Sequence, residues 1–274
     1  MEITSKFFRC EKGSQFNFYF IGDIHEGNVN HAEDEFLEAV EIVKQDNNGY
    51  WIGMGDYVEA ITPKDKRFDP RAVDPKYSLN DLKDLPYKQI EHTYKKMAPI
   101  DDKALVLMLG NHELAYMQHN HSDVYDRFAE MFISEPIQLG YVGFLRCVFT
   151  TTEKKLPLMI ALNHGIHGGG YREGYAMNKV HDVFRWTDAD INVMGHIHQL
   201  QEDDKKITGV GEDGRLYKRR KYWGVSGCFL RTYNDGHPNY FENRGKFESD
   251  IGMLKAEVNV QDKLKITLTK IKLG

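Results

Sequence analysis

Five short apolar runs, most of them ending in glycine and each followed by polar residues, are the feature that most limits how this chain can fold. Each run has the length and the composition of a β-strand. Segments with apolar residues at helical spacing lie between several of these runs. The strands are expected at residues 16–22, 50–55, 104–110, 158–163 and 190–195, and the helices at 32–44, 87–97 and 124–133. This alternation of strands and helices predicts an α/β sandwich.

The remaining segments add strands and one insertion. Residues 62–86 carry four prolines among many charged residues, which predicts an inserted surface loop. Further strands are expected at 141–152, 222–232, 252–260 and 264–272, so residues 200–274 form a strand-rich C-terminal part of the same domain. The length of 274 residues fits a single domain that spans residues 1–274.

The composition is that of an ordinary globular protein. A net charge of −5 argues against a strongly basic nucleic-acid binder, although the basic run at 218–221 is either a solvated strand end or a contact for a polyanion. Three cysteines lie far apart without a CxxC motif, which indicates buried thiols in a reducing compartment. No signal-peptide pattern is present, and no apolar run approaches ~18 residues. We therefore expect a cytoplasmic protein without a membrane segment.

Polar clusters follow the five predicted strands at the point where each strand ends. In open α/β sheets, ligands bind beyond the carboxyl ends of the strands, so these clusters are expected to meet at one site. Their carboxylate, imidazole and carboxamide groups suit manganese, iron or zinc. In chain order the clusters are Asp23 with His25, Asp56, Asn111 with His112 and Glu113, His164, and His196 with His198.

The order of these motifs resembles that of the calcineurin-like metallophosphoesterase superfamily, whose pattern is GD-x-H, GD, GNH followed by an acid, H, and GH-x-H. The resemblance covers residues 16–199. It implies a four-layer αββα sandwich with mixed sheets and an active site at the C-terminal ends of the strands. It also implies two divalent transition-metal ions, with manganese favoured over iron, zinc or nickel.

The same resemblance distributes seven residues over the two ions, and Asp56 would bridge both. The first ion would be held by Asp23, His25, Asp56 and His198, and the second by Asp56, Asn111, His164 and His196. His112 would not ligate a metal and would act on the substrate instead.

The expected chemistry follows from two cations ~3.5–4 Å apart. A water between them would lose a proton near neutral pH and attack the phosphate as a metal-bridging hydroxide, while His112 assists the leaving oxygen. In the protein Ser/Thr phosphatase branch, an acid three residues after the bridging aspartate orients the catalytic histidine. Glu59 has this spacing, so it is either the residue that orients His112 or a solvated loop glutamate.

The residue after Glu59 bears on the substrate. The phosphatase branch has an arginine there that clamps the phosphate, whereas this chain has Ala60. A dianionic monoester gains more from an arginine than a monoanionic diester does, so the missing arginine favours phosphodiesters. Arginines that could reach the site from elsewhere are Arg67, Arg71, Arg172 and Arg231. His167, in a glycine-rich loop, is a further candidate for substrate contact.

Three functions from different classes remain open at this point. The favoured one is a phosphodiesterase, either a nuclease or an enzyme for small diesters, so nucleic acid is among the candidate substrates. The alternative is a phosphomonoesterase that acts on nucleotides or phosphoproteins. The third is a catalytically silent binding scaffold, against which the complete set of ligands and His112 argue. The sequence leaves the oligomeric state open.

Overall fold

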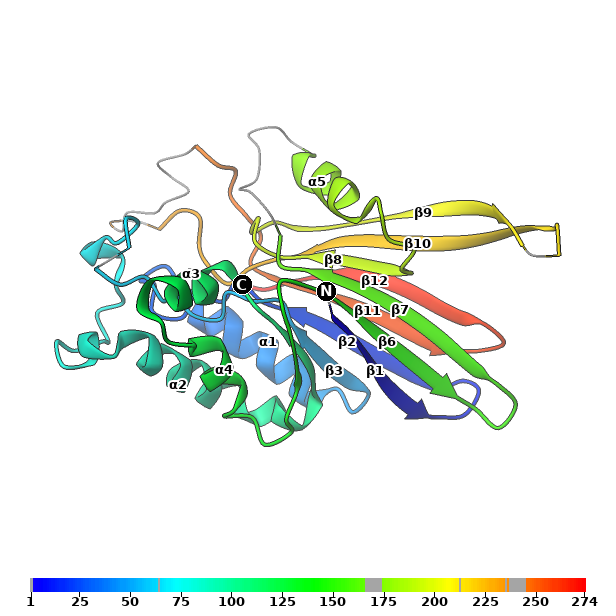
Figure 1. The fold of residues 1–274 in the computed structure, drawn as a ribbon, viewed down its shortest axis with the longest axis horizontal. Coiled ribbons are helices and arrows are strands. Elements are labelled where there is room, and N and C mark those ends of the chain that lie inside the picture. The colour runs from blue at the N-terminus through cyan, green and yellow to red at the C-terminus, as the bar shows by residue number, and fades with distance from the viewer. Residues whose placement is uncertain (1, 64, 166–173, 212, 235, 237–244) are drawn as a thin grey trace.

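The computed structural model describes residues 2–63, 65–165, 174–211, 213–234, 236 and 245–274, and two six-stranded mixed sheets pack face to face in it (Figure 1). The first sheet has the order β12-β11-β2-β3-β4-β5 and the second the order β1-β6-β7-β8-β10-β9. The strands of the first sheet are β2 (Gln15–Ile21), β3 (Gly49–Gly53), β4 (Ala104–Met108), β5 (Ile137–Leu139), β11 (Gly252–Val260) and β12 (Leu264–Lys272). Those of the second are β1 (Glu2–Arg9), β6 (Val142–Thr150), β7 (Lys155–Asn163), β8 (Ile191–Met194), β9 (Leu200–Val210) and β10 (Leu216–Ser226).

A core of apolar side chains from both sheets fills the space between them. Phe8 of β1 stacks on Phe149 of β6 with ring centroids 5.3 Å apart, and it meets Phe18 of β2, in the opposite sheet, edge to face at 6.1 Å. These contacts bury large aromatic surfaces on the inner faces of both sheets, which is the main stabilising contribution to such a sandwich.

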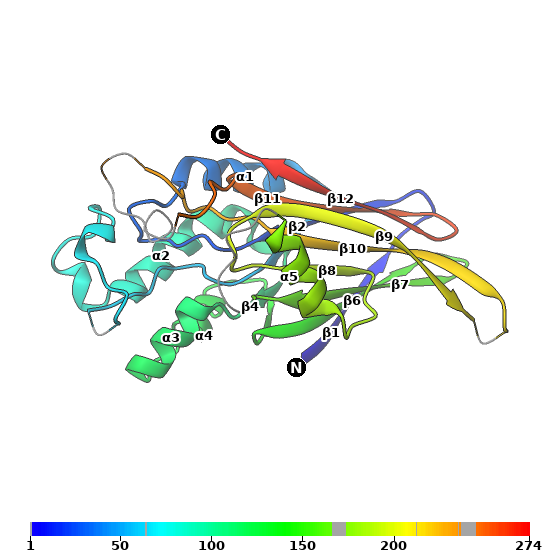
Figure 2. The same ribbon diagram turned by 90° about the horizontal axis from the view of Figure 1, so that it is seen from above.

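Helices cover the two outer faces (Figure 2). The helices α1 (Glu33–Gln45), α2 (Leu85–Met97) and α4 (Val124–Ala129) form a second core with the outer face of the first sheet. The helix α5 (Tyr175–Phe184) packs on the outer face of the second sheet. The prediction of a four-layer αββα sandwich is therefore confirmed. No helix that the structure describes is long and apolar enough to cross a membrane.

Parallel pairing brings the ends of several strands to one edge. The strands β2, β3 and β4 run parallel to one another, and β7 runs parallel to β8. The carboxyl ends of parallel strands lie at the same edge of a sheet, so the loops after these five strands are neighbours. The sheets meet there, since the backbone N–H of His196, after β8, donates to Asp23 Oδ2, after β2, at 2.9 Å.

Several elements differ from the predictions. The structure adds β1, β5, β9, α5 and α3 (Asn111–Asn120), and the strand expected at 222–232 is instead β10, at Leu216–Ser226. The strands β9 and β10 form a hairpin that extends beyond the body of the molecule (Figure 1). No described residue in its outer half is fully buried, so that part of the sequence carries only a weak strand signal.

The segment at 62–86 was expected to be a surface loop, and most of it has no regular structure apart from two short 3-10 helices, Pro70–Ala72 and Asp81–Lys83. Its Tyr77 is nevertheless buried, and the hydroxyl group donates to Glu26 Oε1 at 2.9 Å. Backbone bonds from Val29 to Ala72 at 2.8 Å and from Asp74 to Gly27 at 3.0 Å fix the segment to the loop after β2. The insertion is thus anchored beside the site.

Candidate metal centre

The backbone at the site is strained at most of the candidate ligands. Five of the seven have left-handed backbone, which costs a non-glycine residue about 1–3 kcal/mol. They are Asp23 (φ 48°), His25 (φ 52°), Asp56 (φ 52°), His196 (φ 70°) and His198 (φ 53°). The loops after β2 and β3 support each other there, because the N–H groups of Asp23 and His25 donate to the carbonyls of Gly55 and Asp56 at 2.9 and 3.1 Å. Such strain persists where the surroundings enforce it, commonly at functional sites.

One glycine explains how closely these loops approach. A Cβ at Gly110, just before α3, would lie 2.1 Å from the backbone nitrogen of Asp56. Only glycine leaves room for the loop after β4 to contact the loop after β3 at this distance. The glycine of the motif therefore sets the position of Asn111 relative to Asp56.

The first half of the centre consists of Asp23, His25 and His198, all buried. His198 Nε2 lies 3.1 Å from His25 Nε2 and 3.2 Å from Asp23 Oδ1. His25 Nδ1 faces Glu59 Oε2 at 3.0 Å. A carboxylate that accepts from Nδ1–H fixes the tautomer, so Nε2 of His25 presents its lone pair to the other ligands.

The second half consists of Asn111, His164 and His196. The side-chain oxygen of Asn111 lies 3.1 Å from His164 Nε2 and 2.6 Å from His196 Nδ1. His164 Nδ1 donates to the backbone carbonyl of Met54 at 2.7 Å. A carbonyl can only accept, so Nε2 of neutral His164 carries the lone pair that faces the other ligands.

Asp56 lies between the halves and is almost completely buried. Its Oδ2 is 3.9 Å from His25 Nε2 in the first half and 3.2 Å from His164 Nε2 in the second. Its Oδ1 accepts from the backbone N–H of His112 at 2.9 Å, which fixes the carboxylate. Burial favours the neutral form, but positive charge on the nearby His164 and His112, when they are protonated, outweighs it and holds the pKa of Asp56 well below its usual range. Asp56 is therefore an anion in contact with both halves.

These donor sets fit divalent transition-metal ions. In the second half, the Asn111 oxygen faces His164 Nε2, His196 Nδ1 and, at 3.1 Å, Asp56 Oδ2, so acceptors face one another. Either a rotated amide that donates from nitrogen or a cation between these atoms removes the repulsion. Imidazole, carboxylate and carboxamide ligands suit manganese, iron and zinc. Of the residues described, Asp23, His25 and His198 could hold one ion, and Asp56, His164 and His196 with Asn111 a second.

His112 is the second residue of α3 and lies at the edge of this cluster, where its ring comes close to His25 and Asp56. Its Nδ1 lies 2.5 Å from the backbone carbonyl of Glu59, so Nδ1 carries the proton and Nε2 points away. The Glu59 carboxylate, expected from its spacing to orient His112, lies 4.0 Å from His112 Nδ1 and makes its short contact with His25. Glu59 thus touches both histidines, one through its side chain and the other through its main chain.

Glu113 is a residue to which sequence reasoning assigned no role. It is buried, and it accepts hydrogen bonds from the backbone N–H groups of Asp56, Tyr57 and Val58 at 3.1, 2.7 and 3.3 Å. Burial and the nearby charge of Asp56 raise the pKa of Glu113 to about 7. The acid after GNH therefore fixes the turn that carries Asp56. The position of Glu113 within the motif could have suggested this role from the sequence.

Of the remaining candidates for substrate contact, His167 and Arg172 lie outside the described residues. Arg231 donates to both carboxylate oxygens of Glu35 at 2.7 Å. The side chain of Arg71 is 73% exposed and pairs with Asp69. Arg67 alone of the described candidates contacts the site, with Nη1 3.4 Å from His112 Nε2.

The family model described as calcineurin-like phosphoesterase matches residues 16–200, which contain all seven candidate ligands and His112. No curated protein sequence matches the chain.

Several solved structures resemble the chain over most of its length. Vps29 from Entamoeba histolytica, complexed with zinc, is 12% identical, with a TM-score of 0.37 over 93% of this chain and 99% of that one. A predicted phosphoesterase from Streptococcus pneumoniae is 10% identical, with a TM-score of 0.34 over 95% and 94%. GAP50, the anchor in the inner membrane complex of Plasmodium, is 11% identical, with a TM-score of 0.42 over 95% and 89%. Similarity at this level carries no argument about function.

Proposed function

The chain belongs to the calcineurin-like phosphoesterase family, and from this premise we propose that it hydrolyses phosphate esters at a dinuclear metal centre. The observation that carries the proposal is the position of Asp56, whose Oδ2 faces an imidazole nitrogen of each half, at 3.9 Å from His25 and 3.2 Å from His164. One carboxylate placed between two sets of ligands is what a pair of adjacent cations requires.

Two bound cations would supply Lewis acidity, which makes water more acidic and neutralises charge on the phosphate. The residues of the chain provide the rest. Asp56 and Asp23 supply the negative charge that holds the cations, and Glu113 fixes the backbone around Asp56. His112 holds its Nδ1 proton against the Glu59 carbonyl, so its Nε2 is the atom that can carry a proton to the leaving oxygen. His112 is therefore proposed as the general acid.

The proposed substrates are phosphodiesters, small diesters or nucleic-acid ends. Support comes from position 60, where Ala60 is buried and its backbone N–H donates to Gln89 Oε1 at 2.9 Å. No side chain from this position clamps the phosphate. A phosphomonoesterase is the second candidate, and the observation in its favour is the contact between Arg67 and His112.

The remaining assignments are proposals as well. Manganese is the proposed metal, because the ligands combine carboxylate oxygens with imidazole nitrogens. A single domain over residues 1–274 is supported by β11, near the C-terminus, which pairs with β2, near the N-terminus. A cytoplasmic location is supported by the three free cysteines.

The test is hydrolysis of bis-p-nitrophenyl phosphate and p-nitrophenyl phosphate by the purified protein, with and without Mn²⁺. Metal-dependent turnover that favours the diester is the expected result, and DNA, RNA and cyclic nucleotides would be assayed next. Preference for the monoester would select the second candidate. Turnover of neither ester with Mn²⁺, Fe²⁺, Zn²⁺ or Ni²⁺ would overturn the proposal.

A further inference from the structure

We infer that Arg67, which the inserted segment carries, binds an anionic oxygen of the substrate phosphate beside His112 and makes the site more effective on phosphate dianions. The inference rests on the proposed function and names a residue that sets its substrate preference. The starting observation is that Arg67 Nη1 lies 3.4 Å from His112 Nε2, the atom proposed to serve the leaving oxygen.

The guanidinium group is held in place from one side. Nε of Arg67 donates to Asp65 Oδ1 at 3.1 Å, Nη2 donates to Asp65 Oδ2 at 2.7 Å, and the backbone N–H donates to Asp65 Oδ1 at 2.9 Å. This two-pronged pairing occupies one edge of the planar group and fixes its orientation. The remaining nitrogen, Nη1, is the one that points to His112. An arginine fixed in this way loses little side-chain entropy when it binds an anion.

The segment that carries Arg67 is itself anchored. Lys76 Nζ pairs with the buried Glu26 Oε1 at 2.7 Å, and Tyr77 donates to the same oxygen at 2.9 Å. Glu26 directly follows the candidate ligand His25 in the chain. The position of Arg67 is therefore fixed relative to the metal centre by the same loop that presents His25.

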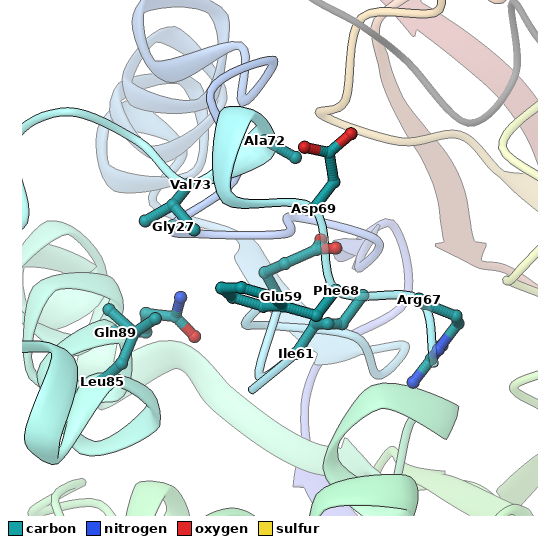
Figure 3. A pocket seen from close by; sticks show the side chains of 10 residues that line it. All are labelled: Gly27, Glu59, Ile61, Arg67, Phe68, Asp69, Ala72, Val73, Leu85 and Gln89. Carbon is teal, nitrogen blue, oxygen red and sulfur yellow. The ribbon is translucent and has the colours of Figure 1, made fainter. Parts of the chain in front are cut away.

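A pocket opens beside this arrangement. Glu59, Arg67 and Phe68 line it together with Leu85 and Gln89 of α2 (Figure 3). Glu59 is the residue whose carboxylate contacts His25 and whose carbonyl contacts His112. The inserted segment thus forms one wall of a pocket that Glu59 and Arg67 line together.

The local motif around Arg67 occurs twice, which provides a matched control. Arg71 pairs with Asp69 through the same pattern of backbone, Nε and Nη2 bonds. Its side chain is 73% exposed, against 37% for Arg67. Both arginines have the same charge, and each pairs with the aspartate two residues before it. Of the two, only Arg67 contacts a residue of the site. A change at Arg71 alters the charge of the segment without altering the site.

The chemical consequence concerns charge on the substrate. A monoester phosphate is a dianion near neutral pH and interacts more strongly with a fixed guanidinium than a monoanionic diester does. Arg67 therefore takes the role that the missing arginine after Glu59 would have had. Its removal should weaken the monoester reaction more than the diester reaction, whichever ester is the natural substrate.

The experiment compares wild type with Arg67→Gln, Arg67→Lys and Arg71→Gln, all loaded with Mn²⁺. We expect Arg67→Gln to lower kcat/KM for p-nitrophenyl phosphate about 10- to 100-fold, the range for losing a hydrogen bond to a charged group. The loss for bis-p-nitrophenyl phosphate should be several times smaller. Arg67→Lys should retain part of the activity, and Arg71→Gln should match wild type.

Binding of inorganic phosphate, measured by calorimetry on the same proteins, provides a readout that does not depend on turnover. Its affinity should fall in Arg67→Gln and not in Arg71→Gln. Equal values for the two variants, in both assays, would overturn the role of Arg67 while leaving the proposed function intact. Arg67-dependent phosphate binding without hydrolysis of any ester would instead overturn the proposed function alone.

If Arg67→Gln fails to fold, Asp65→Asn tests the same idea by removing the partner that orients the guanidinium. A smaller loss in the same direction is expected from Asp65→Asn. No change in phosphate affinity or in the ratio of the two ester rates would contradict the inference.

Discussion

The two halves of the centre fix their histidines by different means. In the first half, the Glu59 carboxylate faces His25 Nδ1 at 3.0 Å. In the second, the main-chain carbonyl of Met54, directly after β3, accepts from His164 Nδ1 at 2.7 Å. A carboxylate raises the basicity of the histidine that it contacts and can be replaced by mutation, whereas a carbonyl at the end of a strand is part of the sheet. The orientation of His25 therefore depends on a side chain, whereas that of His164 is fixed by the main chain.

The first half also carries more negative charge than the second. The first half has its own carboxylate, Asp23, and a second one behind His25. The second half has a neutral carboxamide, Asn111, in the corresponding place. More negative charge attracts a divalent cation more strongly. We therefore expect the first half to bind its metal more tightly and to depend more on side chains of the surrounding loops.

Removing the shared ligand should have the largest effect, because it acts on both halves at once. Asp56→Asn keeps the shape of the side chain and loses the charge that faces His25 and His164. Metal-dependent turnover of either nitrophenyl ester should fall to the background rate. Circular dichroism should show a folded protein, and retained turnover in a folded variant would contradict the placement of Asp56.

Changing His112, which is proposed to act on the substrate and not to ligate a metal, should separate chemistry from metal binding. His112→Gln should lower kcat about 10²- to 10⁴-fold, the usual contribution of a general acid or base. Its metal content, measured by mass spectrometry, should equal that of wild type. His119→Gln, an exposed position on the same helix, is the control. A parallel loss of metal in His112→Gln would mean that His112 is a ligand.

The loop of the first half depends on a buried ionic cluster, and the second half has no counterpart among the residues that the structure describes. Glu26 is fully buried and pairs with Lys96 and Lys76, both at 2.7 Å. Glu26→Ala should lower the free energy of unfolding by about 3 kcal/mol, the lower end for breaking a buried ion pair, because Glu33 still pairs with both lysines. Urea denaturation measures this loss. Glu41→Ala, which removes an exposed partner of Lys44, should leave the denaturation midpoint unchanged.

The smallest expected effect tests the difference between the halves most closely. Glu59→Gln should weaken metal binding about 10- to 100-fold, the range seen when a carboxylate behind a ligating histidine is lost. Only one of the two binding steps in a calorimetric titration should change. Glu38→Gln, exposed on α1, is the control. Equal weakening of both steps would show that the halves do not differ in the way proposed.

Much of this arrangement could be predicted from the sequence, because the strands that precede the candidate ligands are apolar runs with a polar cluster at the end. The helix α5 left a readable signal as well, since its buried residues Ala176, Val180, Val183 and Phe184 recur at helical spacing. The helix α3 shows no such apolar pattern, because Glu113 is its one buried residue. Its start is set by the tertiary contacts of Asn111 and His112 rather than by a pattern in the sequence.

The contacts of Glu59 could not be predicted from spacing alone. Two residues near it, Asp56 and Ala60, have left-handed backbone, so the chain reverses direction in a way that a count of three residues does not reveal. The side chain consequently faces His25, and the main chain faces His112. The contact of Arg67 with the site depends in the same way on the fold of the insertion, which has little regular structure.

We propose that one carboxylate, Asp56, joins two cation sites in a single hydrolytic centre. The most direct measurement is a calorimetric titration of Mn²⁺ into metal-depleted wild type and Asp56→Asn, with the bound metal counted by mass spectrometry. We expect two bound ions per chain in wild type, in two resolved steps, and a weakening of both steps in the variant. A single ion per chain, or two steps that Asp56→Asn leaves unchanged, would contradict it.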